Sequence, residues 1–452
     1  MGKGQLRQYV ICTISQLSVM VVGVAYCWFE PITIRLAEDP NLDLSTEDVS
    51  WLIAILEVGG FIGPFIAGDL TNRVGRKYVI MSIGPLCLAG WILTLISKTL
   101  LCLCIVRILT GLATGVAFTI TPIYTAEVAE PKLRGRLTGT FQTTWYMGTL
   151  YAFSFGPYLS YDMFVYVCIP LPILFTLVWM FMPETPYYLL MTEQEEKARK
   201  VLQYFRDGDD VDKELEDMQN AVKEEMSVEG SWKILFTDKV ERKAFIIVQI
   251  VSITKFLTGM PVIVNYALDT FSRGESFLSA EEMSILLAVL LTLIAVVSAF
   301  MSDWIGRKPL LLVSCFGCFV AHFLTGGYYY IHEKTSLDST NYTWALYVGL
   351  MMYCFFSDIG LGPLLQTLQS EMFGASTRGV AGGITEGLAA FLCFIVLKLY
   401  TPVNEIFGVY MNFWFYSLTG LVGGLLLLWL MYETAGKTIG QMENTPKKKV
   451  LA

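Results

Sequence analysis

The chain consists largely of apolar runs about 20 residues long, separated by short charged or Pro- and Gly-containing segments. An α-helix rises about 1.5 Å per residue, so about 20 apolar residues cross the hydrocarbon core of a bilayer. Of the 452 residues, 54% are hydrophobic and only 16% are charged, compared with roughly 25% charged in a soluble domain. The runs therefore predict an all-α membrane protein.

Twelve such runs predict twelve transmembrane helices in two six-helix bundles. The first six are expected near residues 10–32, 51–70, 79–97, 100–126, 137–160 and 163–182. The second six are expected near residues 243–271, 284–302, 310–331, 344–370, 379–401 and 407–431. The first run is too long for a signal-peptide core and has no small-residue cleavage site, so we interpret it as a span.

One long polar stretch separates the two sets of spans. It predicts a first bundle at 1–183, a helical linker at 184–242, a second bundle at 243–432 and a tail at 433–452. The charge runs inside the linker are typical of solvated helices, and we prefer this interpretation to a nucleic-acid or metal site.

Lysine and arginine are concentrated in alternate loops. They follow the second, fourth, eighth and tenth spans, for example at Arg76, Arg134, Arg307 and Arg378. Cytoplasmic loops are enriched in these residues, so both termini and the linker are expected in the cytoplasm. We expect the plasma membrane as the location. The sequon at Asn341 then falls in an outer loop and is the predicted glycosylation site.

Short motifs of the first half recur in the second half in the same order. The recurring pairs are 72–77 with 303–308, Glu127 and Arg134 with Glu371 and Arg378, and Glu184 with Glu433. An internal repeat of this kind is typical of transporters built from two related bundles, with the solute site between them.

The repeated charges are predicted to form a gate at the cytoplasmic face. Its expected members are Arg76, Glu127, Arg134, Glu184, Arg307, Glu371, Arg378 and Glu433. Partly desolvated ion pairs contribute on the order of 1–3 kcal/mol each, which can bias a two-state equilibrium. The alternative is that these charges only set the topology and stiffen the loops, but that role requires no acid at Glu127 or Glu371.

Polar side chains inside the apolar runs mark the predicted solute site. At about 1.5 Å per residue, Gln142 lies about 12 Å and Lys255 about 18 Å into their spans. Asp358 and Glu386 lie at comparable depth. Lys255 needs a compensating partner, which is either one of these two acids or an anionic solute, and both interpretations stay open.

Neither a metal site nor a cofactor is predicted, and an enzyme is not expected. The ten cysteines lie in apolar runs and are interpreted as buried thiols, including the C-x-x-C pair Cys315 and Cys318. His322 and His332 form no metal or catalytic cluster with other residues. The sequence also has no nucleophile–base arrangement and no phosphate-binding loop.

Taken together, these motifs resemble those of the sugar-porter family of the major facilitator superfamily over nearly the whole chain. The motifs that carry the resemblance are Gly75-Arg76-Lys77, Arg107-x-x-x-Gly111-x-x-x-Gly115, Pro122-x-Tyr124-x-x-Glu127, Arg134-Gly135, Pro183-Glu184-Thr185-Pro186, Gly306-Arg307-Lys308, Gly360-x-Gly362-Pro363, Glu371, Arg378-Gly379 and Glu433-Thr434-x-Gly436-Lys437-Thr438. The first span, with Trp28 and Pro31, is most similar to the insect trehalose-transporter branch. The resemblance implies a facilitative carrier of a hexose or trehalose.

The resemblance also implies a sugar site, from which this chain departs in part. Gln142 stands at the position of the family's hexose-binding glutamine. The family's Gln-Gln-x-Ser-Gly-x-Asn on the seventh span is replaced by the segment 255–261, in which only Thr258 and Gly259 match. Gln366 stands where the family has a tryptophan. The expected substrate-binding residues are Gln142, Lys255, Thr258, Gly259, Asp358, Gln366 and Glu386.

The sequence is compatible with three functions. The first is facilitated diffusion of a sugar, and the second is carriage of an anionic or other non-sugar solute, motivated by Lys255. The third is a non-transporting nutrient sensor on the same fold, which the short tail disfavours. Proton-coupled family members carry an aspartate in the first span where this chain has Ala25, so uniport is expected.

Overall fold

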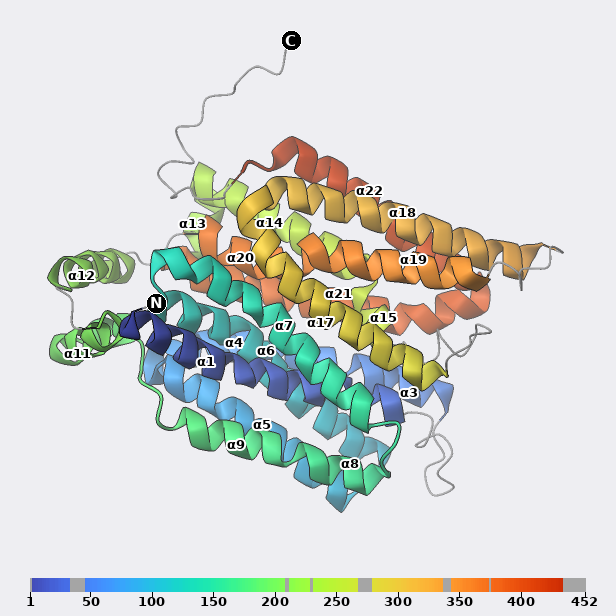
Figure 1. The fold of residues 1–452 in the computed structure, drawn as a ribbon, viewed down its shortest axis with the longest axis horizontal. Coiled ribbons are helices and arrows are strands. Elements are labelled where there is room, and N and C mark those ends of the chain that lie inside the picture. The colour runs from blue at the N-terminus through green and yellow to red at the C-terminus, as the bar shows by residue number, and fades with distance from the viewer. Residues whose placement is uncertain are drawn as a thin grey trace, which may run out of the picture.

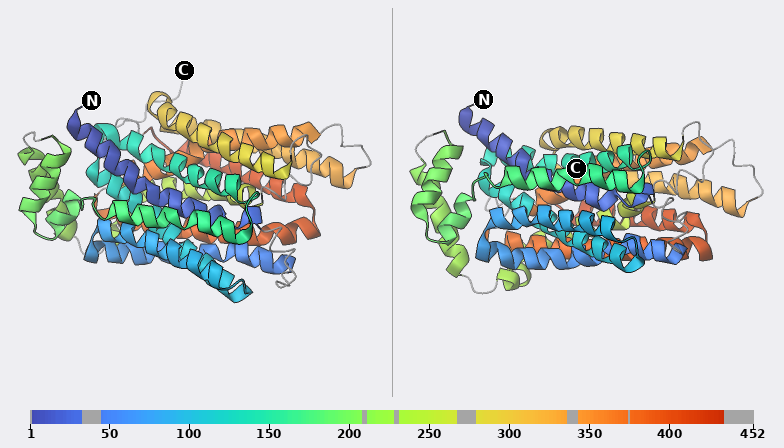
Figure 2. Two further views of the ribbon diagram at one scale, coloured as in Figure 1. Left: turned by 60° about the horizontal axis from the view of Figure 1, so that its bottom comes forward. Right: turned by 90° about the horizontal axis from the view of Figure 1, so that it is seen from below.

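The computed structural model describes residues 2–32, 45–207, 211–227, 231–266, 279–335, 343–373 and 375–433. Within these ranges every regular element is a helix, and the long helices run side by side in one bundle (Figure 1). The short helices α11 and α12 lie at one end of this bundle, which we call the linker end (Figure 2).

We use "first half" for the helices up to α9 and "second half" for those from α14 onward. The first half contains α1 (Lys3–Cys27), η1 (Glu30–Ile32), α3 (Thr46–Ala54), α4 (Leu56–Val74), α5 (Arg76–Ile96), α6 (Leu100–Val128), α7 (Pro131–Phe155), α8 (Tyr161–Cys168) and α9 (Pro170–Trp179). The helices between the halves are α10 (Pro186–Met191), α11 (Glu195–Phe205), α12 (Asp212–Ser227) and α13 (Ser231–Thr237).

The second half repeats the pattern of long helices, with two of them interrupted. It contains α14 (Lys239–Leu257), α15 (Met260–Asn265), α17 (Ala280–Ile305), α18 (Arg307–Lys334), α19 (Thr343–Phe356), the π-helical turn η3 (Ser357–Leu361), α20 (Gly362–Met372), α21 (Ala375–Ile406) and α22 (Val409–Leu430). The division of the chain into bundles, linker and tail stays a prediction.

Eleven stretches of the described residues are long and apolar enough to cross a membrane. They coincide with eleven of the twelve predicted spans, within several residues at each end. The remaining predicted span, 137–160, corresponds to α7, a helix of 25 residues whose polar composition excludes it from this set. Three of its polar or aromatic residues, Gln142, Trp145 and Tyr146, line the central cavity described below.

The first span begins at Lys3, earlier than predicted, because a polar helical turn docks on the helices at the linker end. The Gln8 side chain donates to Glu130 Oε1 at 2.8 Å and to the Phe205 carbonyl at 2.9 Å. Arg7 donates to the Tyr204 carbonyl at 2.8 Å. These bonds tie the start of α1 to the α6–α7 connection and to α11.

Close helix packing depends on glycine where α4 crosses α6. A Cβ atom at Gly111 would lie 1.9 Å from the Leu56 carbonyl, and one at Gly59 would lie 2.2 Å from the Ile108 carbonyl. Small residues at such crossings let the backbones approach, as is common between transmembrane helices. Across the two halves, α7 packs against α17 and α4 packs against α21.

Two spans of the second half are broken near the middle of the bundle. Between α14 and α15, Gly259 adopts a left-handed φ of 86°, which disfavours any side chain. Between α19 and α20, Pro363 has no N–H, and the Ser298 hydroxyl donates to the Ile359 carbonyl at 2.8 Å instead. Broken helices are tolerated at membrane depth where neighbouring side chains satisfy the backbone in this way.

We expect Gly259→Ala to destabilise the protein, because left-handed backbone costs about 1–2 kcal/mol for an L-residue. The new Cβ would also lie 2.6 Å from the Tyr416 ring. The midpoint of thermal unfolding in detergent should fall by at least about 2 °C. Gly327→Ala on α18 is the control, since a Cβ there meets nothing within 4 Å. Equal midpoints for the two variants would contradict this account of the break.

Candidate functional site

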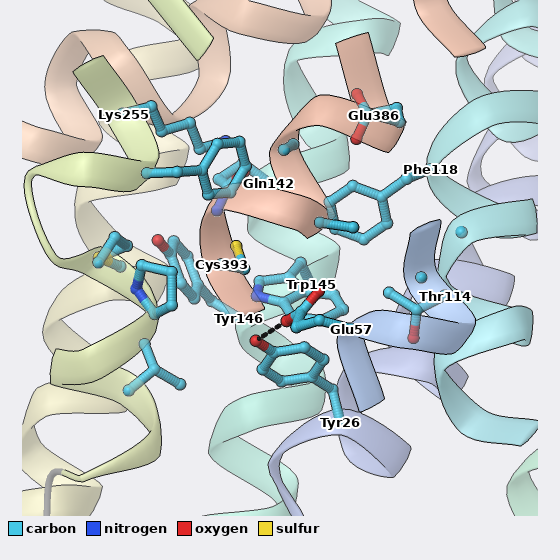
Figure 3. Close-up of a pocket in the computed structure, with 18 residues that line it drawn as sticks. Tyr26, Glu57, Thr114, Phe118, Gln142, Trp145, Tyr146, Lys255, Glu386 and Cys393 are labelled. Atoms are coloured by element: carbon cyan, nitrogen blue, oxygen red, sulfur yellow. Dashed lines mark hydrogen bonds between the residues drawn. The ribbon is translucent and has the colours of Figure 1, made fainter. Parts of the chain in front are cut away.

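A cavity of about 100 Å³ lies between the two halves and is lined by helices of both (Figure 3). The first half contributes α1, α4, α6 and α7, and the second half contributes α14, α15 and α21. Its polar lining residues are Tyr26, Glu57, Thr114, Gln142, Trp145, Tyr146, Lys255 and Glu386. The mixture of aromatic rings and a few polar groups is typical of a small-molecule site.

Helix α7 presents one face to this cavity, and that face carries Gln142 as predicted. Trp145 and Tyr146 follow within one turn and line the same cavity. The Trp145 ring packs edge-on against the rings of Phe118 at 5.0 Å and Tyr26 at 5.1 Å. The Tyr146 hydroxyl donates to Asp358 Oδ1 at 2.6 Å, which joins the first half to η3 of the second half.

Lys255 lines the cavity from the end of α14, and its ammonium binds a carbonyl. Nζ donates to the Gly362 carbonyl at 3.0 Å, next to the break before α20. Among the residues that the structure describes, no carboxylate lies within 4.0 Å of Nζ. Glu386 and Asp358 act on its charge only from a longer distance. Neither forms the direct ion pair that was one of the two open interpretations.

Glu386 is held by two glutamines of α20. Its Oε1 atom accepts from Gln366 Nε2 and from Gln369 Nε2, each at 3.0 Å. The Gln366 Oε1 atom is buried and has no partner among the described residues. Gln369 was not predicted as a site residue, although its spacing of three from Gln366 places both amides on one helix face.

The other predicted site residues lie behind the cavity wall. Thr258 and Gly259 form the break between α14 and α15, where the Thr258 hydroxyl donates to the Lys255 carbonyl at 2.9 Å. Asp358 and Gln366 are buried next to lining residues without lining the cavity themselves. The role of each in solute binding stays a prediction.

Several cavity residues were missed by the sequence analysis, namely Tyr26, Glu57, Trp145 and Tyr146. Glu57 did carry a signal, because it is a carboxylate well inside the apolar run near residues 51–70, whereas the other acid of that run, Asp69, lies at its end. The two aromatic residues could have been found from their spacing of three and four after Gln142. Tyr26 carried no signal that distinguishes it from a lipid-facing tyrosine.

At the linker end, two repeated arginine–glutamate pairs hold helix ends together. Arg76 at the start of α5 donates to Glu127 at the end of α6, with Nη2 and Oε1 3.0 Å apart. Arg307 at the start of α18 donates to Glu371 of α20, with Nη2 and Oε1 2.9 Å apart. Each of these pairs joins two helices of the same half.

Two further glutamates bind the backbone at the same helix starts. Glu184 accepts from the Lys77 N–H at 3.0 Å, and Glu433 accepts from the Arg307 N–H at 2.9 Å. Burial raises the pKa of the Glu184 carboxyl above its usual range, although the N–H bonds from Lys77 and Thr185 oppose the shift. The side chains of Arg134 and Arg378, and Asn341, lie outside the described residues, so their predicted roles stay predictions.

A second cavity of about 640 Å³ lies at the linker end, between α4, α6, α12 and α21. Helices α4, α6 and α21 line both cavities, and on α4 the lining residue Pro64 lies one turn after Gly60 of the central cavity. The two cavities therefore follow one another along the bundle. The larger cavity lies on the linker side of the central one.

A model of the family described as "Sugar (and other) transporter" matches residues 4–445. The chain is similar to the facilitated trehalose transporter Tret1 of Bombyx mori, at 25% identity over 94% of this chain and 84% of that protein. It is 24% identical to Tret1 of Drosophila willistoni over 95% of this chain, but spans only 50% of that relative.

The fold is similar to that of a solved transporter. The proton:xylose symporter XylE of E. coli superimposes with a TM-score of 0.81 at 20% identity, over 96% of this chain and 98% of the other. This confirms the predicted major facilitator fold, and the family match confirms that the chain is a carrier, as expected, and not an enzyme. This multi-pass membrane protein with the major facilitator fold therefore belongs to the "Sugar (and other) transporter" family.

Proposed function

We propose that this chain carries a hexose or trehalose across the plasma membrane by facilitated diffusion, with both termini in the cytoplasm. The observation that carries the proposal is the central cavity lined by α7 of the first half and by α14 and α21 of the second half. A solute bound there contacts both halves. Rocking of the halves about the solute then changes the end at which it can leave.

The lining chemistry supports a sugar. The Gln142 amide offers two donors and two acceptor lone pairs, which suits adjacent hydroxyls. The rings of Phe118, Trp145 and Tyr146 supply apolar surface for the C–H faces of a sugar ring. Uniport is proposed because Ala25, where proton-coupled relatives carry an acid, has no titratable group and is fully buried.

An anionic solute is the second candidate, and one observation favours it. The Lys255 ammonium lines the cavity without a carboxylate of the described residues within 4.0 Å. A bound anion would supply a negative charge next to this ammonium, and an unpaired ammonium is costly at membrane depth. If the solute is a sugar, the ammonium instead donates a hydrogen bond to one of its hydroxyl oxygens.

For a sugar carrier, Gln142→Leu should reduce uptake of labelled hexose or trehalose by roughly tenfold, because one buried hydrogen-bonding group is lost at about 1–3 kcal/mol. The assay uses purified protein in liposomes with matched protein content. Gln203→Leu is the control, since Gln203 is exposed on α11. Unchanged kinetics in the Gln142 variant would mean that the sugar does not bind at this cavity.

Competition separates the two candidate solutes. We expect unlabelled sugars, and not organic anions, to inhibit uptake, and Lys255→Met to retain measurable sugar transport. The reason is that a neutral solute needs Lys255 only as one hydrogen-bond donor among several. Transport of an anion by the wild type, abolished selectively in Lys255→Met, would favour the second candidate.

The ion pairs at the linker end should stabilise the state that is closed there. Arg76→Ala or Arg307→Ala leaves Glu127 or Glu371 without its arginine. We expect several-fold faster thiol labelling of an Ile384→Cys reporter from the linker side, because the helix ends separate more easily.

Arg73→Ala is the matched control, because Arg73 forms an exposed pair with Asp69 one turn away on α4. Such exposed pairs contribute about 0–1 kcal/mol. Equal labelling rates in all variants would show that the buried pairs have no gating role.

A further inference from the structure

Glu57 is a buried carboxylate that lines the central cavity. It lies 17 residues before the end of α4 at Val74, so it is about 25 Å from the linker end of that helix. Figure 3 shows Glu57 and Tyr26 across the cavity from Lys255 and Glu386. An ionisable residue at such depth is costly, and this cost calls for a function.

Only one oxygen of the Glu57 carboxylate is occupied. Oε1 accepts from the Tyr26 hydroxyl at 2.7 Å. Oε2 has no hydrogen bond in the part of the chain that the structure describes, and it lies next to Gly60, another lining residue. A Cβ atom at Gly60 would lie 3.3 Å from this oxygen. One oxygen is therefore held in place and the other is left for a ligand.

A hydrogen-bond chain from the second half positions this carboxylate. Asn265 Nδ2 donates to the Tyr26 hydroxyl oxygen at 3.3 Å and to the Pro261 carbonyl at 2.9 Å. Tyrosine has a single hydroxyl proton, so a hydroxyl that accepts from Asn265 directs that proton to Glu57. The order Asn265 to Tyr26 to Glu57 is thus consistent in its donors and acceptors.

A buried ion pair would be the structural alternative for Glu57, and the nearest arginine is occupied elsewhere. The guanidinium of Arg107 donates to the Tyr26 and Leu52 carbonyls, both at 2.9 Å, and to the Ile53 carbonyl at 3.4 Å. It forms no ion pair with Glu57 within 4.0 Å. Arg107 therefore fixes the ends of α1 and α3 around the site and leaves the carboxylate available.

We propose that Glu57 is a solute-binding residue whose Oε2 atom accepts a hydroxyl of the sugar, and that Tyr26 and Asn265 are its positioning residues. The proposal rests on the proposed function for the class of solute. An ionised carboxylate only accepts, and its charge-assisted bonds are about twice as strong as neutral ones. Together with Lys255 and Glu386 across the cavity, it provides polar groups at two ends of one site, which suits a polyhydroxylated solute.

The test measures transport of a series of deoxy sugars, each lacking one hydroxyl, by purified protein in liposomes. In the wild type, one analogue should be transported with a roughly tenfold higher KM, because its missing hydroxyl leaves Glu57 without a ligand. In Glu57→Leu the KM of the parent sugar should rise by a similar factor, and the penalty for that analogue should disappear. Glu57→Gln keeps an acceptor for Tyr26. In this variant the rise in KM for the same analogue should be several-fold smaller than in the wild type.

If Glu57 had a merely structural role, its substitution would lower the amount of folded protein. It would not change which deoxy analogue has the raised KM. Wild-type discrimination among the analogues in Glu57→Gln would therefore overturn the proposal, even if Glu57→Leu fails to fold. Asp162→Asn is the control, because Asp162 is an exposed acid paired with Lys98 on the surface. If the wild type transports no sugar, the proposed function itself fails. If it does and the variants match it, only the role of Glu57 fails.

Discussion

The absence of water in the bilayer core is the constraint on which the rest of this structure depends. Backbone N–H and C=O groups must be satisfied within the protein, so the spans are helices. Where a span breaks, a neighbouring side chain compensates, as Ser298 does for the Ile359 carbonyl that Pro363 leaves without a donor. Polar side chains obey the same rule. Each one at membrane depth needs a partner or a cavity, and Glu57, Lys255 and Glu386 have both.

This constraint explains why the most polar long helix packs along the contact between the two halves. Helix α7 lacks the apolar composition of the other spans, yet it packs against α1 of its own half and α17 of the other. Its cavity face carries Gln142 and the two aromatic residues that follow it. The Tyr146 bond to Asp358 adds a direct link between the halves. The same helix thus contributes to the central cavity and to a direct contact between the two halves.

The sequence predicted the fold class and the spans well because apolar length and repeated loop motifs are one-dimensional signals. It also placed Gln142, Lys255, Asp358 and Glu386 at comparable depth. Three of them line the cavity and Asp358 lies behind its wall, and the role of each in solute binding stays a prediction. It could not predict which way each side chain points around its helix. Thr258 was expected in the site and lies behind its wall, while Glu57 was overlooked and lines it. The Lys255 contact with the Gly362 carbonyl depends on how two broken helices meet, which spacing does not encode.

The most direct test of a facilitative sugar carrier is counterflow in liposomes. Purified protein is reconstituted, the liposomes are loaded with unlabelled sugar, and a trace of labelled sugar is added outside. A carrier with one site between two halves predicts that label accumulates transiently inside, at the same level with or without a pH gradient. Absence of the transient with every sugar, or sustained accumulation driven by the pH gradient, would contradict the account.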